Sequence, residues 1–285
     1  SNTLNYRSAL TLATLATLAG CVASWLLADA LIQQFSGRGL VPDTIVNTPQ
    51  FALGVAAGAA FTVFLATCLG LPISTTHALI GALVGAGLGQ VNGEIHFDKL
   101  AQSFLLPLLI SPLIAASLGV VAYKILRARS AAQDCACVVP APPLIIARAN
   151  AASVHEFSLP NIVIAENSAC ENVSVRSRWS ISRALDKLHI ASALSICFAR
   201  GLNDTPKLAA LLLTARFFQH SYSVAVVGGV MALGGILAAR KVAETMSHRI
   251  TRLDASQGLA ANLITAMLVI FASKFGMPVS TTHVS

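Results

Sequence analysis

Long apolar stretches without charge recur along this chain, and each is long enough to form a membrane-spanning helix. The first, Ser8 to Ala28, has 21 residues, most of them Ala, Leu and Thr. A helix needs about 20 residues to cross roughly 30 Å of hydrocarbon. Further apolar runs follow at Leu100 to Tyr123, Phe217 to Ala239 and Ala255 to Ser273. The pattern predicts an all-α polytopic membrane protein.

One uncharged stretch is too long for a single span. Residues 44–93 carry no Asp, Glu, Lys or Arg, but a proline and a polar string interrupt them at 72–77. Proline removes a backbone donor and disfavours a helix interior, and irregular backbone at membrane depth must be buried in protein or line a cavity. We therefore expect a helix over about 51–71, an unwound, re-entrant segment at 72–77 and a second helix over 78–90.

A second polar interruption lies in the apolar stretch that begins at Leu188. Residues 200–207 include Asn203, Asp204 and Pro206, and hydrophobic residues resume after them. A proline two residues after a carboxylate favours local unwinding. We expect a span with a polar break in its middle.

Residues 127–187 differ from the rest of the chain. They are polar and contain a Pro-rich stretch at 138–144. Such a composition cannot bury much of a core, so we expect a partly disordered linker. The predicted parts are a first membrane repeat at 1–126, the linker at 127–187 and a second membrane repeat at 188–285.

The composition excludes an ordinary soluble globule, because 55% of the residues are hydrophobic and only 11% are charged, whereas soluble domains average about 25% charged. The net charge of +7 does not indicate nucleic-acid binding, since the basic residues lie between apolar runs and aromatic residues make up only 6%. The six cysteines form no CxxC pair. We therefore predict neither a disulfide framework nor a zinc site.

The polar string of the first half recurs in the second half. Gly70-Leu-Pro-Ile-Ser-Thr-Thr-His77 and Gly276-Met-Pro-Val-Ser-Thr-Thr-His283 agree at six of eight positions, at a constant offset of 206 residues. Each string follows an apolar run of similar length. This agreement indicates an internal repeat that extends beyond the motif.

The charges of the connectors indicate that the two repeats have opposite orientations. Residues 29–50 contain one Arg and two Asp, whereas residues 240–254 contain four Lys or Arg and two acidic residues. By the positive-inside rule, the first connector faces outward, and the second connector and the linker at 127–187 face the cytoplasm. Inverted-topology repeats with broken helices at mid-membrane are typical of secondary transporters. We expect a multi-pass protein of the plasma membrane, which is the inner membrane in a bacterium.

Alignment of the two repeats predicts that the chain is cut within both of them. Counterparts of Asn203 and Asp204 would lie before Ser1, and the chain stops at Ser285, where the first repeat continues into a further helix. We expect a first repeat truncated at its N-terminal side and a second repeat truncated at its C-terminal side.

The three consecutive hydroxyls after each proline are the first candidates for substrate binding: Ser74, Thr75, Thr76, Ser280, Thr281 and Thr282. An unwound segment frees backbone N–H groups, and together with the hydroxyls these can hold an oxyanion that has lost its water. The alternative is that the hydroxyls bond back to helix carbonyls. The second copy of the string favours the binding role.

Asn203 and Asp204 are the candidates for a coupling-ion site. An intramembrane carboxylate costs about 2.5–3.5 kcal/mol on insertion scales, so it normally faces a cavity and holds a cation or a proton. Asn203 adds a neutral oxygen. The alternative is a simple ion pair with Arg200 or Lys207, which can coexist with the functional role.

His77 and His283 are accessory candidates. A histidine at this place can relay a proton or bond an oxyanion. The alternative is that each histidine at a helix start is structural.

Together these motifs resemble the inorganic phosphate transporter family of membrane symporters. The matching residues are Pro-Ile-Ser-Thr-Thr-His at 72–77, Pro-Val-Ser-Thr-Thr-His at 278–283 and Gly-Leu-Asn-Asp-Thr-Pro-Lys at 201–207. They stand in the family's order and spacing, and the resemblance covers nearly all of the chain except the linker. It implies a transporter, not an enzyme, that takes up inorganic phosphate with Na⁺ or H⁺ by alternating access and needs no cofactor besides that ion.

The resemblance also implies roles for individual residues. The two hydroxyl strings would contact phosphate, and Asn203 and Asp204 would contact the coupling ion, as metal ligands if that ion is Na⁺. Members of the family commonly have small residues and a second Asn after the Asn-Asp pair, whereas Thr205, Pro206 and Lys207 follow here. The ammonium of Lys207 would either replace a Na⁺ site or add an anion contact, which leaves the choice between Na⁺ and H⁺ open. The expected partners are phosphate, the coupling ion and the lipid bilayer; homo-oligomers are left open.

Three other functions fit parts of the sequence. A permease for another oxyanion such as sulfate would use the same scaffold. An intramembrane hydrolase could be assembled from Ser74, His77 and Asp204, but the chain has no GxSxG elbow, and two copies of the string suit a symmetric binding site better than a single nucleophile. A membrane receptor or scaffold would act through the linker.

Overall fold

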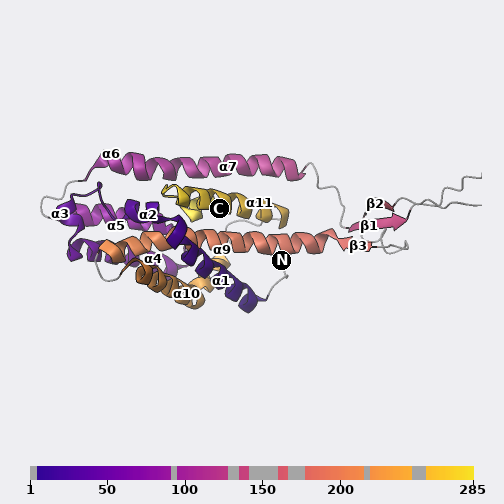
Figure 1. Cartoon of the computed structure of the whole chain (residues 1–285), viewed down its shortest axis with the longest axis horizontal. Helices are drawn as coiled ribbons and strands as arrows, with labels where there is room; N and C mark the ends of the chain where they lie inside the picture. The colour runs from indigo at the N-terminus through magenta and orange to yellow at the C-terminus, as the bar shows by residue number, and fades with distance from the viewer. Residues whose placement is uncertain are drawn as a thin grey trace, which may run out of the picture.

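A bundle of helices packed around one long central helix makes up most of the molecule (Figure 1). The structure is a computed structural model and describes residues 5–90, 95–127, 135–140, 160–165, 177–214, 219–245 and 255–285. The central helix, α9 (Ile181–Thr214), packs against α1 (Tyr6–Leu27), α10 (His220–Thr245) and α11 (Ala255–Lys274). The polar segment of α9 is therefore enclosed by other helices.

Two glycines set the crossing of α1 and α9. A Cβ atom on Gly20 would collide with the carbonyl oxygen of Phe198, and a Cβ atom on Gly201 would collide with that of Thr17. The missing side chains let the two backbones touch, as small residues do in close-packed membrane helices. The crossing holds α1 beside the polar segment of α9.

The break predicted in the first uncharged stretch is confirmed. Helix α4 (Pro49–Leu69) ends at Gly70, whose φ of 71° lies in the left-handed region that glycine adopts at no steric cost. A loop follows, and α5 begins at Thr75 and ends at Leu88. The loop is shorter than predicted, since Thr75 and Thr76 lie in the first helical turn.

The second copy of the motif has the same local structure. After α11, Gly276 has a φ of 69°, and Ser280 precedes the short helix α12 (Thr281–Val284). Ser74 and Ser280 both have extended backbones, and each hydroxyl accepts the backbone N–H of the histidine three residues later. Both serines are thus N-caps, which accounts for where α5 and α12 begin.

The predicted break in α9 is wrong. The helix continues without interruption through Pro206 to Thr214. The packing of α1, α10 and α11 around it offsets the cost of one lost backbone hydrogen bond, and neighbouring helices commonly make proline tolerable in membrane helices.

Four of the described helical segments are long and apolar enough to cross a membrane: Tyr6–Leu27, Pro49–Leu69, Phe97–Lys124 and Gln257–Lys274. The third runs through α6 (Phe97–Leu100), the π-helical turn η1 (Ala101–Leu105) and α7 (Leu106–Arg127), which contains Pro112. Outward faces are apolar, as exposures of 81% for Leu26 and 76% for Leu237 illustrate. Such surfaces suit a lipid environment.

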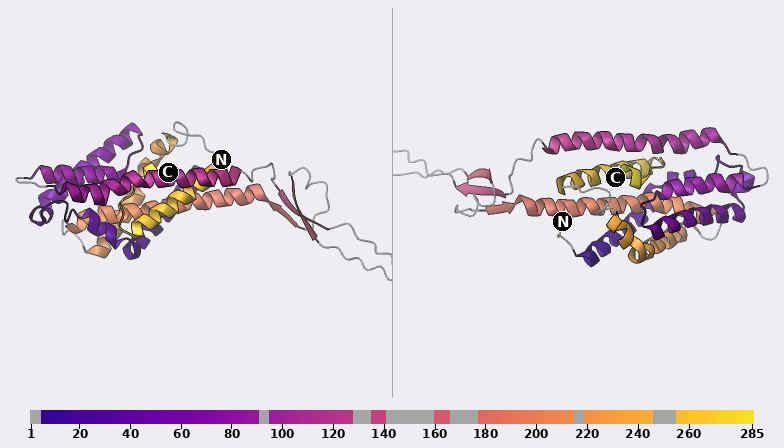
Figure 2. Two further views of the ribbon diagram at one scale, coloured as in Figure 1. Left: turned by 90° about the horizontal axis from the view of Figure 1, so that it is seen from above. Right: turned by 180° about the vertical axis from the view of Figure 1, so that it is seen from behind.

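Strands form where a partly disordered linker was predicted. β1 (Cys135–Pro140) pairs antiparallel with β2 (Pro160–Ala165) and with β3 (Ser177–Ser180), in the order β2-β1-β3. Figure 2 shows this sheet beyond the bundle, at the start of α9. Residues 181–187, predicted as the end of the linker, form the first turns of α9. Residues 128–134, 141–159 and 166–176 of the linker and residues 246–254 of the basic connector lie outside the described residues.

Short helices cap the opposite end of the molecule. The connector at 29–50 folds into α2 (Asp29–Phe35) and α3 (Asp43–Val46). In Figure 1, α3 and α6 lie at the end of the bundle away from the sheet.

Candidate functional site

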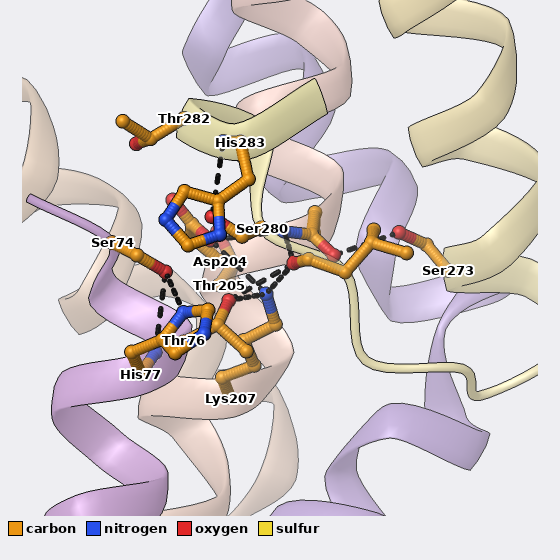
Figure 3. A network of polar contacts seen from close by, with 12 residues as sticks. Ser74, Thr76, His77, Asp204, Thr205, Lys207, Ser273, Ser280, Thr282 and His283 are labelled. Carbon is orange, nitrogen blue, oxygen red and sulfur yellow. Dashed lines mark hydrogen bonds and ion pairs between the residues drawn. The ribbon is translucent and has the colours of Figure 1, made fainter. Parts of the chain in front are cut away.

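Both motif loops meet the polar segment of α9 inside the bundle (Figure 3). Asn203 and Lys207 are fully buried, and Asp204 is 6% exposed. Ser74, Thr76, Ser280 and Thr281 are buried as well. The structure thus brings residues that lie more than 120 positions apart in the chain into one polar network, because Lys207 bonds Thr76.

The two loops exchange equivalent hydrogen bonds. The Thr76 hydroxyl donates to the carbonyl oxygen of Val279 at 3.0 Å, and the Thr282 hydroxyl donates to that of Ile73 at 3.2 Å. Thr282 and Val279 occupy the repeat positions of Thr76 and Ile73. The bonds therefore run in opposite directions between equivalent atoms, which gives the site a local two-fold pattern; the inverted orientation of the whole repeats stays a prediction.

The serine and the histidine of each motif share a capping hydrogen bond, and those of the first motif also share a side-chain contact. The Ser74 hydroxyl lies 2.8 Å from Nδ1 of His77, in addition to its capping bond. The rings of His77 and His283 lie side by side, with centroids 4.6 Å apart and a tilt of 53°. Both predicted accessory histidines are therefore at the site, although each is exposed on one side.

Lys207 connects the network. Its ammonium donates to the Thr76 hydroxyl at 2.7 Å, to the Val279 carbonyl at 3.2 Å and to Oδ1 of Asp204 at 3.3 Å. The same ammonium lies 5.6 Å from the ring centroid of Phe35. A buried charge requires a counter-charge and hydrogen bonds, and Lys207 has both.

Asp204 and Asn203 share the same centre. Oδ1 of Asp204 accepts a second hydrogen bond from Nδ2 of Asn203 at 3.1 Å. The Asn203 amide also lies 3.4 Å from the Val279 carbonyl, and its oxygen accepts from the hydroxyl of Ser273 at 3.2 Å. Of the two ion pairs considered from the sequence, the structure contains the one with Lys207.

The geometry does not form a hydrolytic triad. Ser74 contacts His77, but the bonds of the Asp204 carboxylate go to Asn203 and Lys207. Without an acid to orient the imidazole, the serine lacks the arrangement of an activated nucleophile.

Sequence reasoning missed the carbonyl of Val279, along with Ser273 and Phe35. The Val279 carbonyl accepts from Thr76, Asn203 and Lys207. An apolar residue type gives no indication that its backbone oxygen will be used. The proline before it was the available signal, since an interrupted helix leaves carbonyls without partners. Thr75 and Thr281, in contrast, form no side-chain hydrogen bond with a described residue.

The network offers both donors and acceptors to a small charged ligand. Lys207 and the hydroxyls of the two loops are donors for an oxyanion, whereas Asp204 and the Val279 carbonyl are acceptors. The described residues contain no cluster of three or more His, Cys, Asp or Glu. A sodium ion here would therefore have Asp204 as its carboxylate and Asn203, hydroxyl and backbone oxygens as neutral ligands.

Comparisons with known proteins agree on one family. The chain matches the sequence profile of the phosphate transporter family over residues 1–285. It is 26% identical to the Pyrococcus horikoshii protein named "Putative phosphate permease PH0640", over 86% of this chain and 70% of that protein. It is 25% identical to "Inorganic phosphate transporter 2-1, chloroplastic" of Arabidopsis thaliana, over 89% of this chain and 57% of that protein.

A solved structure shares the fold. The protein described as "The sodium-dependent phosphate transporter" superimposes with a TM-score of 0.71 and 19% sequence identity, covering 99% of this chain and 79% of that one. At this identity the likeness concerns the fold alone.

Proposed function

Because this chain belongs to the phosphate transporter family, we propose that it carries inorganic phosphate across a membrane in symport with Na⁺ or H⁺. The family and the four long apolar helices among the described residues make it an integral membrane protein. The observation that carries the proposal is the buried network in which both motif loops meet Lys207 and Asp204.

Phosphate is held by the two hydroxyl strings and by Lys207. The candidate contacts are Ser74, Thr75, Thr76, Ser280, Thr281 and Thr282. In the structure, Thr76 and Thr282 donate to carbonyls of the opposite loop. A phosphate oxygen takes the place of those carbonyls as the acceptor, and the ammonium of Lys207 adds a charge-assisted bond, which is roughly twice as strong as a neutral one.

The carboxylate of Asp204 makes transport of phosphate dependent on a cation. Two like charges 4 Å apart repel by about 4 kcal/mol at an effective dielectric constant of 20. The network already contains one positive and one negative side chain, so a phosphate anion enters with an uncompensated charge. A Na⁺ or H⁺ at Asp204 and Asn203 supplies the compensating positive charge. Because phosphate and the cation occupy the site together, the transport of one is coupled to the transport of the other.

Alternating access follows from displacement of one repeat against the other around this fixed site. The parts at 1–126 and 188–285 are the two repeats that move in the plasma membrane, and the part at 127–187 is a cytoplasmic linker.

The acceptors in the network favour phosphate over sulfate. Sulfate carries no proton at neutral pH and can only accept hydrogen bonds, whereas phosphate keeps a proton that it can donate. The Val279 carbonyl is a suitable acceptor for that proton, and so is the Asp204 carboxylate when the coupling ion is Na⁺. A site built with such acceptors rejects an anion that leaves them unpaired.

The test is uptake of radiolabelled phosphate into proteoliposomes with an imposed Na⁺ or pH gradient. We expect one gradient to drive uptake and the Asp204→Asn variant to lose it, while Asp186→Asn, the same change elsewhere on α9, keeps it. Sulfate uptake without phosphate uptake would overturn the substrate. Undiminished uptake by Asp204→Asn would overturn the coupling site and revive a role for the linker.

A further inference from the structure

A second polar hollow lies outside the buried network, beside α2 and α6. Its volume is about 590 Å³, and its walls come from α2, the connector after it, the start of the α6 helix and the C-terminal turn of α9. By the charge rule applied to the sequence, the connector at 29–50 faces outward. The hollow is thus at the outer end of the proposed transporter.

The hollow is basic. Arg38 and Lys99 line it, and none of the described residues that line it is acidic. The Lys99 side chain runs along the backbone at Gly39, where its Cε lies 3.9 Å from the place a Cβ would take. Neither cation forms an ion pair or a side-chain hydrogen bond with a described residue. Two cations that have no partner among the described residues of the hollow attract an anion.

The other polar side chains of the hollow differ in whether they already form hydrogen bonds. Gln34 donates to the Ser103 carbonyl, Asn47 to the Asp43 carbonyl and Thr214 to the Ala210 carbonyl. The amide of Gln33 forms no side-chain hydrogen bond with a described residue. Gln33, Arg38 and Lys99 therefore remain as donors for a ligand.

Helix α2 stands between the hollow and the buried network. It lines the hollow with Gln33, and its Phe35 is buried with the ring 5.6 Å from the Lys207 ammonium. Phe35 packs edge-on against Phe104 of η1, with centroids 5.5 Å apart and an angle of 89°. Ala210, which also lines the hollow, is three residues after Lys207 on α9. Neighbouring residues of α2 and of α9 thus belong to the hollow and to the buried network, respectively.

We propose that this hollow is an anion-collecting vestibule, in which Gln33, Arg38 and Lys99 bind a phosphate-type oxyanion before it passes Phe35 to the buried network. The proposal rests on the proposed function. An arginine fork and an ammonium suit the oxygens of phosphate, and a cleft of one charge raises the local concentration of its ligand. The phosphate of a lipid headgroup has the same chemistry, but the position ahead of Lys207 points to the free ion.

The first experiment measures binding of radiolabelled inorganic phosphate to the purified full chain in a maltoside detergent that contains no phosphate. The Lys207→Met/Asp204→Leu variant, which lacks the ammonium and the carboxylate of the buried network, should still bind phosphate at the vestibule. Adding Arg38→Gln and Lys99→Gln should weaken that binding at least tenfold, whereas adding Arg7→Gln and Lys124→Gln, a pair with equal charge change outside the hollow, should not. If only phosphatidylglycerol binding depends on Arg38 and Lys99, the site holds lipid and the proposal is overturned.

The second experiment measures uptake kinetics in vesicles. The Arg38→Gln/Lys99→Gln variant should show a KM raised roughly tenfold with an unchanged maximal rate. The difference should shrink in about 0.5 M KCl, because salt screens exposed charges. An unchanged KM in this variant would overturn the vestibule and leave the transport proposal intact, while absence of phosphate uptake by the wild-type chain would overturn the transport proposal itself.

Discussion

Lys207 is the side chain on which the polar network depends most. It is fully buried, and its three oxygen partners come from α5, from the loop before α12 and from α9 itself. The hydrogen bonds of the Lys207 ammonium thus link three segments of the chain. Removing one member of a buried ion pair leaves the other charge without compensation, which is costlier than removing both.

The Lys207→Met variant should lose about 3–5 kcal/mol of stability, because Asp204 remains buried without its counter-charge. The Lys207→Met/Asp204→Leu variant should regain most of that stability but transport nothing. Thermal unfolding in detergent measures the first effect, and phosphate uptake measures the second. A single variant as stable as the wild type would show that water or an ion already compensates Asp204.

Among the elements, the crossing of α1 and α9 has the least tolerance for change. A methyl group at Gly20 would meet backbone atoms of α9, which cannot rotate away as a side chain can. Gly20→Ala should therefore destabilise the protein by about 1–3 kcal/mol or more, since the helices must move apart. Gly119→Ala is the matched control, because nothing lies within 4 Å of its added methyl group. Unfolding midpoints that fall equally in both variants would contradict the role of the crossing.

Two of the elements show which structural features could be predicted from the sequence and which could not. Pro72 and the hydroxyl string correctly predict the loop between α4 and α5, because a proline in an apolar run acts locally. Pro206 does not break α9, because the outcome there depends on packing by three other helices. The polar residues around it find partners without unwinding, for instance Thr205, whose hydroxyl donates to the Cys21 sulfur at 2.9 Å. Long-range packing of this kind leaves no mark in a local pattern.

At the scale of the whole molecule, the transport machinery and the sheet are separate. The sheet lies beyond the bundle, at the start of α9 (Figure 2). Its existence was not predicted from the sequence, since strand pairing brings together segments that share no periodic signal. The candidate site lies entirely among helices and motif loops.

Replacing residues 128–180 by a Gly-Ser segment of equal length should therefore leave phosphate uptake within about twofold of the wild-type rate. The measurement is the same proteoliposome assay, with reconstituted protein quantified in both samples. Loss of uptake by a correctly inserted variant would show that the linker takes part in transport. That result would favour the receptor or scaffold function.

The reciprocal bonds between the two motif loops have a consequence for biosynthesis. Thr76 and Val279, which share one of these bonds, are 203 positions apart in the chain. Hydrogen bonds within a helix join residues only four positions apart. A chain emerging from the ribosome inserts its first helices long before the second loop is made. Until then, Thr76 and Lys207 lack the Val279 carbonyl as an acceptor. The binding centre is complete only when the second loop arrives. A half-made protein in the membrane consequently has only part of the polar network.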